Sequence, residues 1–350
     1  MSGMSRRAFL RIGGGMACLA PLASSSYASQ QEPDRRLRLG TAWPLYGNLL
    51  GLSTRRLAQR IRWRSGGALG LDLVDTGAMA LPSLDDIGSA PLDGWHASAH
   101  LWPDAPPVWP LFGMQMFGMT APELRVWRNT SPGLDLREEF ARQAGLASWF
   151  TGEIGAGGVL VADGVWSTSG DIACSPGSAP IWERLGFDVV ATPPALGLIA
   201  VTSGVAIAAE VPPLLAGPVR QLVNAGLGYA RFGGSAPGLA TELVIKADIM
   251  AGFSPALAAV IAEACAEEST VLAAEAAWEE ELWIDALDRA GLLVEAPAET
   301  VKSIGKAAAD SLRSMESSGP SGVAVDAYQK MRRTLGITAA SCRDRNSAFA

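Results

Sequence analysis

The longest stretch without a glycine or an internal proline, residues 255–290, constrains the fold of this chain most. It is rich in Ala and Glu and stops at Gly291. Ser254 is a favoured N-cap residue, and Pro255 suits the first helical position. We therefore predict one helix over 255–290, about 55 Å long at 1.5 Å per residue, which is long enough to run along two lobes.

Short segments with strand character alternate with helical ones in the rest of the chain. Segments 36–43 and 69–76 are of this kind, and the amphipathic segment 53–67 between them ends in a Gly-Gly pair. This order predicts a βαβ unit and hence a parallel sheet flanked by helices. Further strands are predicted at 158–165, 187–192 and 240–247, and further helices at about 298–315 and 323–335.

The N-terminus has the pattern of an export signal. Arg6-Arg7 precedes a weakly apolar stretch, and Ser26-Tyr27-Ala28 provides the small residues that a signal peptidase recognises. We expect a twin-arginine signal peptide over residues 1–28, cleavage after Ala28 and a periplasmic location. Because many twin-arginine passengers carry a cofactor, a redox enzyme is the first hypothesis to test.

Net charge and cysteine content exclude several classes of partner and scaffold. The chain has a formal net charge of −7, and loss of the three arginines of the leader would make it −10. This balance disfavours nucleic acid and anionic membranes, which require clustered Lys and Arg. The remaining cysteines, Cys174, Cys265 and Cys342, are too few and too scattered for a disulfide framework.

The uncharged segment 189–209 is long enough to span a bilayer. It contains Pro193-Pro194 and two glycines, together with Thr and Ser. We interpret it as buried α/β core and expect the mature protein to be soluble.

The sequence lacks the common motifs of catalysis. It has no P-loop, no Gly-x-Ser-x-Gly elbow and no Cys-x-x-Cys, and Leu160 occupies the position of the last glycine of a dinucleotide fingerprint. His96 and His100 could share a metal on one helix face, but no carboxylate or cysteine lies within their turn. We interpret them as hydrogen-bonded residues near a pocket or core, and we infer no cofactor. Paired carboxylates distant in sequence leave a hydrolase open.

Seven short segments, taken in order, resemble the DctP-type solute-binding proteins of tripartite ATP-independent periplasmic (TRAP) transporters. The similarity covers residues 36 to about 336 and is greatest to the branch that binds 2-oxo acids such as pyruvate. Members of this branch often have twin-arginine leaders without a cofactor, so the leader need not imply redox chemistry. The segments are GTAWP (40–44), RSGG (64–67), WHASAHLW (95–102), MFGM (116–119), SPGS (175–178), AAE (208–210) and ELVIK (242–246).

The resemblance implies an α/β fold of the two-lobed periplasmic binding protein type (type II-like). A long helix would span both lobes, C-terminal helices would follow, and the lobes would close on a ligand. The first lobe is expected over 36–156 plus about 240–270, and the second over 157–239 plus about 271–318. Residues 319–350 would form a C-terminal helix and tail.

One departure from the family concerns the ligand clamp. The family's Met-Arg-Ile-Pro-Gly appears here as Ala-Cys-Ser-Pro-Gly, with Cys174 in place of the arginine. That arginine holds a carboxylate in the family, because a guanidinium makes two parallel charge-assisted hydrogen bonds. A thiol cannot do this, so we expect weak binding of pyruvate-like acids.

Other departures replace large or charged residues with small or apolar ones. The family's Gln before a Gly-Gly pair appears as Gly155, and its Glu-Trp pair, which holds ligand and in some members a cation, appears as Glu210-Val211. A Tyr of the first-lobe aromatic cluster appears as His100. A later Pro-Gly-Trp-His is Phe232-Gly233-Gly234-Ser235, whereas Glu210, Trp43-Pro44, His96 and Trp102 are retained.

These comparisons predict a binding protein and not an enzyme. It would deliver a small organic solute, either a 2-oxo acid or a bulkier or neutral one, to TRAP permease subunits. A sensing or scaffold protein without cargo, and an exported hydrolase, are the alternatives. A cation at Glu210 and a homodimer through the C-terminal helix are further expectations. The predicted cleft residues are Trp43, His100, Trp102, Gly155, Cys174, Glu210 and Val211.

Overall fold

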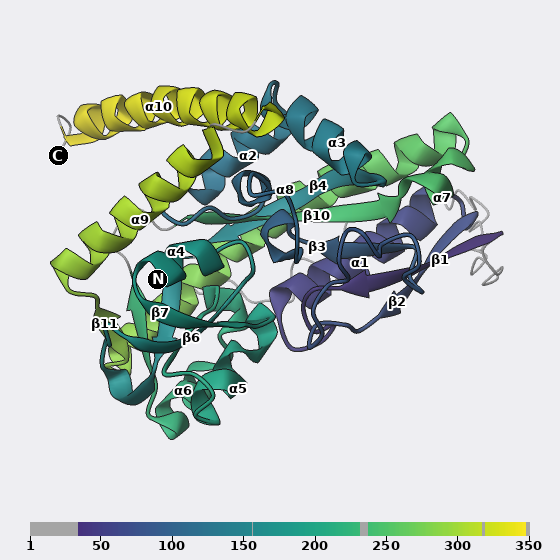
Figure 1. Cartoon of the computed structure of the whole chain (residues 1–350). Coiled ribbons are helices and arrows are strands. Elements are labelled where there is room, and N and C mark those ends of the chain that lie inside the picture. The colour runs from purple at the N-terminus through teal and green to yellow at the C-terminus, as the bar shows by residue number, and fades with distance from the viewer. Residues whose placement is uncertain (1–33, 156, 232–236, 317–318, 348–350) are drawn as a thin grey trace, which may run out of the picture. The chain divides into compact units, whose positions relative to one another are not determined.

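Two β-sheets with helices packed against them organise the chain (Figure 1). The computed structural model describes residues 34–155, 157–231, 237–316 and 319–347. The predicted leader, residues 1–28, and the compared segment 232–235 lie outside the described residues. The two sheets confirm the α/β class and the two-lobed architecture expected from the sequence.

The first lobe is built on a five-stranded sheet of order β2-β1-β3-β10-β4. Strand β1 pairs in parallel with β2 and β3, whereas β10 is antiparallel to β3 and β4. The elements are β1 (Arg35–Thr41), α1 (Leu49–Arg64), β2 (Leu69–Val74), β3 (Gly94–Ala97), α2 (Ala121–Asn129), α3 (Gly133–Gln143), β4 (Leu146–Gly155) and β10 (Gly238–Lys246).

The predicted βαβ opening is confirmed by β1, α1 and β2. The helix begins at Leu49, earlier than the predicted residue 53. The reason is Asn48, whose side chain caps the helix by accepting a hydrogen bond from Gly51 N at 2.8 Å.

The second lobe is built on a six-stranded sheet of order β11-β9-β5-β8-β6-β7. Its elements are β5 (Gly158–Val161), β6 (Gly170–Cys174), α4 (Ala179–Arg184), β7 (Phe187–Ala191), α5 (Gly197–Thr202), β8 (Ala208–Glu210), α6 (Val219–Ala225), β9 (Gly228–Arg231) and β11 (Leu293–Glu295). The uncharged segment 189–209 forms β7, α5 and β8 of the second lobe, as predicted for an α/β segment, but it is buried only in part, since Ile199 and Val205 are exposed. Within the described residues, the helices are too short or too polar to cross a membrane.

The two lobes share their central connections. The chain passes from β4 into β5 and returns from β9 into β10, so two strands of each sheet lead across the junction. Helix α8 (Pro255–Arg289) confirms the predicted 255–290 helix. It packs against α1 and β4 of the first lobe and against α6 and β11 of the second. In the first lobe it is held by salt bridges from Arg56 and Arg60 to the buried carboxylate of Glu268.

The C-terminal helices complete the fold on the side seen at the top of Figure 1. Helix α9 (Ala298–Glu316) agrees with the predicted 298–315 helix and packs against α4. Helix α10 (Pro320–Ser347) packs against α9, α2 and α3 and is much longer than the predicted 323–335. Gly336 lies inside this helix, and a single glycine costs a helix only about 1 kcal/mol.

Short helices and turns fill the remaining chain. They are α7 (Ala247–Ala251) and the 3₁₀ helices η1 (Ala99–Leu101), η2 (Trp109–Phe112), η3 (Ala162–Gly164), η4 (Pro194–Leu196) and η5 (Pro213–Leu215). Two of the three cysteines after the leader, Cys174 and Cys265, are free and buried. The side chain of Cys342 lies outside the described residues.

Candidate binding cleft

The lobes meet where the loops that follow β3 and β6 touch. The amide of Gly177, three residues after β6, donates a hydrogen bond to the carbonyl of His100 at 2.9 Å. A Cβ atom on Gly177 would lie 2.8 Å from both the Cβ and the carbonyl oxygen of His100. Glycine therefore permits this close approach of the two lobes, and a cavity lies on each side of it.

The first of these, which we call the apolar cavity, has a volume of about 100 Å³. The first lobe contributes the segment 79–81 together with Ala42 and Leu101, and the second contributes Pro176 and the segment 191–194. Thr192 is the one polar side chain among the described lining residues, and its hydroxyl is already bonded to the carbonyl of Val190. The cavity thus offers a solute apolar contact and no charge.

The second, which we call the polar cavity, has a volume of about 290 Å³. It lies between the 99–110 segment of the first lobe, the Pro176–Pro180 turn of the second and the end of α9. His100 and Trp102, both predicted from the sequence, line it. Its charged lining residues are Asp104 and Arg184, one of each sign.

His100 and Trp102 are fixed by their surroundings. The Nδ1 atom of His100 lies 2.9 Å from the hydroxyl of Ser98, and burial lowers the pKa of the imidazole to about 3. The ring is therefore neutral at physiological pH. The indole of Trp102 packs edge-on to Trp95 and Trp109, at ring-centroid distances of 5.6 and 6.4 Å. Its buried N–H has no hydrogen-bond partner in the described part of the chain.

The predicted second-lobe residues lie under the cleft instead of lining it. Cys174 is buried in the second-lobe core, and burial raises the pKa of its thiol, which is therefore protonated. The carboxylate of Glu210 accepts hydrogen bonds from the Ser175 hydroxyl at 3.1 Å and from the Trp182 indole at 3.0 Å. Burial raises the pKa of Glu210. Val211 is fully buried.

The surroundings of Glu210 do not provide a set of ligands for a cation. The carboxylate is satisfied by neutral donors, whereas calcium and sodium favour several oxygen ligands, among them more than one acid or carbonyl. Among the described residues no group of three His, Cys, Asp or Glu side chains could hold a metal ion.

Trp43 belongs to the first-lobe core. Its indole donates to the Thr54 hydroxyl at 3.0 Å and meets the ring of His96 edge-on at 4.9 Å. His96 lies on β3, so it does not share a helix face with His100, and the helical metal pair considered from the sequence does not form. The ring nitrogens of His96 lie 2.6 and 2.8 Å from the hydroxyls of Thr54 and Thr151.

Gly155 lies at the end of β4, where the chain crosses between the lobes. Its amide donates to the carboxylate of Glu280 on α8 at 2.5 Å. Burial raises the pKa of Glu280 to about 7. A Cβ atom at position 155 would lie 2.4 Å from this carboxylate, so a larger residue would displace the Glu280 side chain.

The structure thus brings His100 and Trp102 into one cavity and leaves the other five predicted residues in the core or at the crossing strands. Sequence reasoning missed the 79–81 loop, Pro193-Pro194 and Arg184. The proline pair gave a local signal, because such pairs mark strand ends and turns. Neither the loop nor the arginine carries a pattern that would identify it.

The fold is similar to that of solved periplasmic solute-binding proteins of TRAP transporters. No protein-family model and no curated protein matches the chain. A protein from Pseudoalteromonas atlantica, with bound sodium and pyruvate, superposes with a TM-score of 0.78 at 17% identity, over 91% of this chain and 98% of that one. A protein from Colwellia psychrerythraea, with bound calcium and pyruvate, also superposes with a TM-score of 0.78 at 17% identity, over 91% of this chain and 100% of that one.

A third similar structure comes from Bordetella bronchiseptica. This solute-binding protein, with copurified calcium and picolinate in one site of a dimer, gives a TM-score of 0.77 at 18% identity, over 91% of this chain and 98% of that one. At these identities the likeness establishes the fold, and the ligands belong to those proteins.

Proposed function

We propose that the chain is a periplasmic solute-binding protein that delivers a small organic solute to the membrane subunits of a TRAP transporter. The observation that carries this proposal is the Gly177–His100 contact between the lobes, with a cavity on each side. Both cavities lie beyond the carboxyl ends of strands in both sheets, which is where open α/β sheets bind ligands. The likeness in fold to three such proteins supports it. The chain would bind and release its solute without chemical change.

The lining favours an uncharged solute over a 2-oxo acid. Cys174 supplies no guanidinium, and the apolar cavity has no charged lining residue. In the polar cavity the two charged lining residues, Asp104 and Arg184, are of opposite sign. We therefore propose a small polar solute with an apolar portion, such as an amide, a ketone or an alcohol.

The test is a thermal-shift screen of small neutral solutes and acids, followed by calorimetry on two variants. Trp102→Phe replaces an indole that lines the polar cavity with a smaller ring. The control, Trp127→Phe, removes an equally buried and unpartnered indole N–H that lines neither cavity. We expect solute binding to weaken about tenfold in Trp102→Phe, equivalent to about 1.4 kcal/mol, and to persist in the control. Equal affinity in both variants would contradict the assignment of the cleft.

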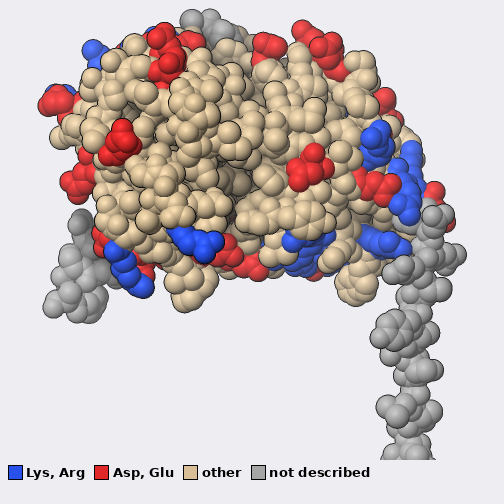
Figure 2. Space-filling view, turned by 90° about the horizontal axis from the view of Figure 1, so that it is seen from below, with Lys and Arg blue, Asp and Glu red and all other residues tan. Residues whose placement is uncertain are grey.

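Export and partners follow from the same proposal. The leader pattern over residues 1–28 favours twin-arginine export to the periplasm. Retention of periplasmic yield after Arg6→Lys with Arg7→Lys would rule this route out. On the face shown in Figure 2, Lys and Arg lie mainly along the lower edge and the right-hand side, whereas Asp and Glu lie along the upper edge and among them. The charged residues seen on this face form no continuous basic patch of the kind that nucleic acid requires.

Lobe boundaries and subunit pairing are also proposals. We assign residues 36–156 plus about 240–270 to the first lobe and 157–239 plus about 271–318 to the second.

The C-terminal helix α10 is anchored to its own chain by Tyr328, whose hydroxyl accepts a hydrogen bond from Met119 N at 2.8 Å. The helix continues for nearly twenty residues beyond Tyr328, to Ser347, and we propose that this part pairs two subunits. A monomer by light scattering at high concentration would exclude it.

A further inference from the structure

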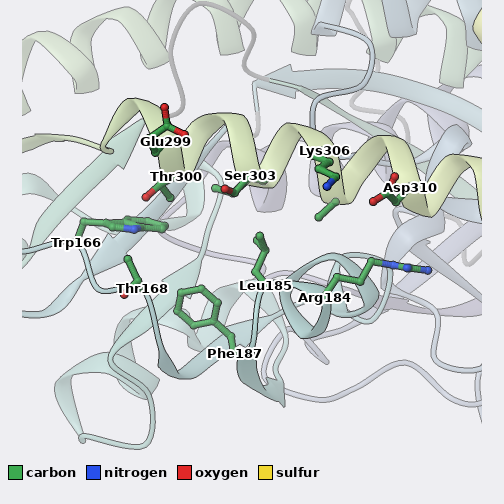
Figure 3. A pocket seen from close by; sticks show the side chains of 12 residues that line it. Trp166, Thr168, Arg184, Leu185, Phe187, Glu299, Thr300, Ser303, Lys306 and Asp310 are labelled. Carbon is green, nitrogen blue, oxygen red and sulfur yellow. The ribbon is translucent and has the colours of Figure 1, made fainter.

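A third cavity lies outside the cleft, between helix α9 and the second lobe (Figure 3). Its volume is about 640 Å³, larger than either cleft cavity. One wall is a face of α9 that includes Thr300 and Ser303, and the opposite wall carries Trp166, Leu185 and Phe187. We call this cavity the α9 groove. It has the size of an ordinary small-molecule site.

One end of the α9 groove carries positive charge. Arg184 from α4 and Lys306 from α9 both lie there, at the right of Figure 3. Within the described chain neither forms a salt bridge, and the guanidinium of Arg184 donates a long hydrogen bond to the Ser314 hydroxyl at 3.5 Å. Asp310 lies at the same end but is already bound by Arg313. Two cations thus remain available to an anionic group.

The other end of the α9 groove is aromatic. Figure 3 shows the Trp166 ring lying flat beneath the first turn of α9, close to Thr300, with Phe187 below it. The Trp166 ring packs against Trp182, with ring centroids 6.4 Å apart and the ring planes tilted by 38°. Lys306 lies six positions after Thr300 on the helix, a rise of about 9 Å. An apolar surface and a cationic end therefore lie within the length of one small molecule.

We propose that the α9 groove is a second binding site, for an amphipathic organic anion. Its aromatic or aliphatic body would lie on Trp166 and Phe187, and its acid group would meet Lys306 and Arg184. Charge complementarity supports an anion, because the acidic side chain at that end is neutralised by Arg313 and the two cations are not. This site is separate from the proposed solute cleft, although Arg184 also borders the polar cavity.

The probe that tests this site is 4-phenylbutyrate, with 4-phenylbutanamide as its uncharged counterpart. Lys306→Gln removes a cation of the α9 groove alone, since Lys306 lines no other cavity described above. Lys302→Gln is the matched control: it removes an exposed lysine of the same helix that does not line the groove. Both side chains are at the surface, so both variants should fold. Thermal unfolding would verify this.

Calorimetry should show that the native protein binds 4-phenylbutyrate more tightly than 4-phenylbutanamide. Added salt should weaken the binding of 4-phenylbutyrate, because it screens the exposed cations. Affinity should fall about fivefold in Lys306→Gln, equivalent to about 1 kcal/mol, and stay unchanged in Lys302→Gln. Trp166→Ala should also weaken binding, of acid and amide alike. Absence of binding at millimolar concentration, or equal loss in the two lysine variants, would overturn the proposal without bearing on the cleft.

Discussion

Each lobe buries a carboxylate, and the surroundings of the two carboxylates shift their pKa values in opposite directions. In the first lobe, Glu242 on β10 accepts hydrogen bonds from the guanidinium groups of Arg128 and Arg137, at 2.9 and 2.5 Å. Burial alone would raise the pKa of Glu242, but the two arginines lower it to about 2. In the second lobe, Glu210 is bonded to the neutral donors Ser175 and Trp182, and burial raises its pKa.

The difference separates a structural role from a role near the cleft. The Glu242 cluster joins α2, α3, β4 and β10 inside the first lobe and is ionised throughout the physiological range. Glu210 lies one hydrogen bond away from Ser175, which precedes the cleft residues Pro176 and Gly177. Among the described residues Glu210 has no cation beside it, and burial disfavours its ionised form. Where Glu210 is ionised, its uncompensated charge would repel an anionic solute, so the cleft is better suited to an uncharged one.

The largest expected effect is loss of the Glu242 carboxylate. Glu242→Gln leaves two buried guanidinium groups without their anion, and breaking a buried ion pair on one side costs about 3–5 kcal/mol. Urea denaturation would measure it. The control is Glu139→Gln, which removes an exposed partner of Arg142 and should change the stability little, because solvent screens an exposed pair. Equal losses in the two variants would refute the structural role of the cluster.

The pH dependence of stability should separate the two carboxylates by sign. The folded pKa of Glu242 is depressed from its ordinary 4.5, so its contribution is present above pH 4.5 and is lost as pH falls toward 2. The folded pKa of Glu210 is raised, so its ionisation costs stability as pH rises above 4.5. Native stability relative to Glu242→Gln should therefore decline on acidification. The stability of the native protein relative to Glu210→Gln should decline as pH rises. The same pH dependence of both stability differences would contradict the contrast between the two carboxylates.

A smaller effect is expected where the lobes touch. Gly177→Ala would press a methyl group against His100 and displace the hydrogen bond between them. We expect a stability loss of about 1 kcal/mol, the value of one hydrogen bond, and a larger radius of gyration in X-ray scattering. Gly305→Ala is the control, because its Cβ would meet Phe117 only at 3.5 Å, an ordinary contact, inside helix α9. An unchanged radius of gyration in Gly177→Ala would mean that the contact does not hold the lobes together.

Local signals made much of the fold predictable. Helix α8 runs over Pro255–Arg289 almost as predicted, because Ser254 caps its start and Gly291 follows its end. The length of α10 was not predicted: the helix continues past Gly336 to Ser347, since a lone glycine does not stop a helix. The Glu242 cluster was also invisible, since its partners Arg128 and Arg137 lie 114 and 105 residues away in sequence.

The cleft was predictable only in part, for the same reason. His100 and Trp102 lie in one segment whose resemblance to a known family could be followed residue by residue, and both line the polar cavity. Cys174 was expected to face the ligand, yet its side chain is buried with the second-lobe core. Which side of a strand end faces a cleft depends on how the two lobes meet, and no periodicity within one segment encodes that.

The most direct test of the account is a thermal-shift comparison of small acids with their own amides, beginning with pyruvate and pyruvamide. Saturating ligand stabilises the folded protein, by about 2.7 kcal/mol at 100 times its dissociation constant. We predict that the largest shift comes from an uncharged member of a pair and that pyruvate gives little or none. A largest shift from an acid, or no shift from any compound in the comparison, would contradict the claim that this cleft binds a small uncharged solute.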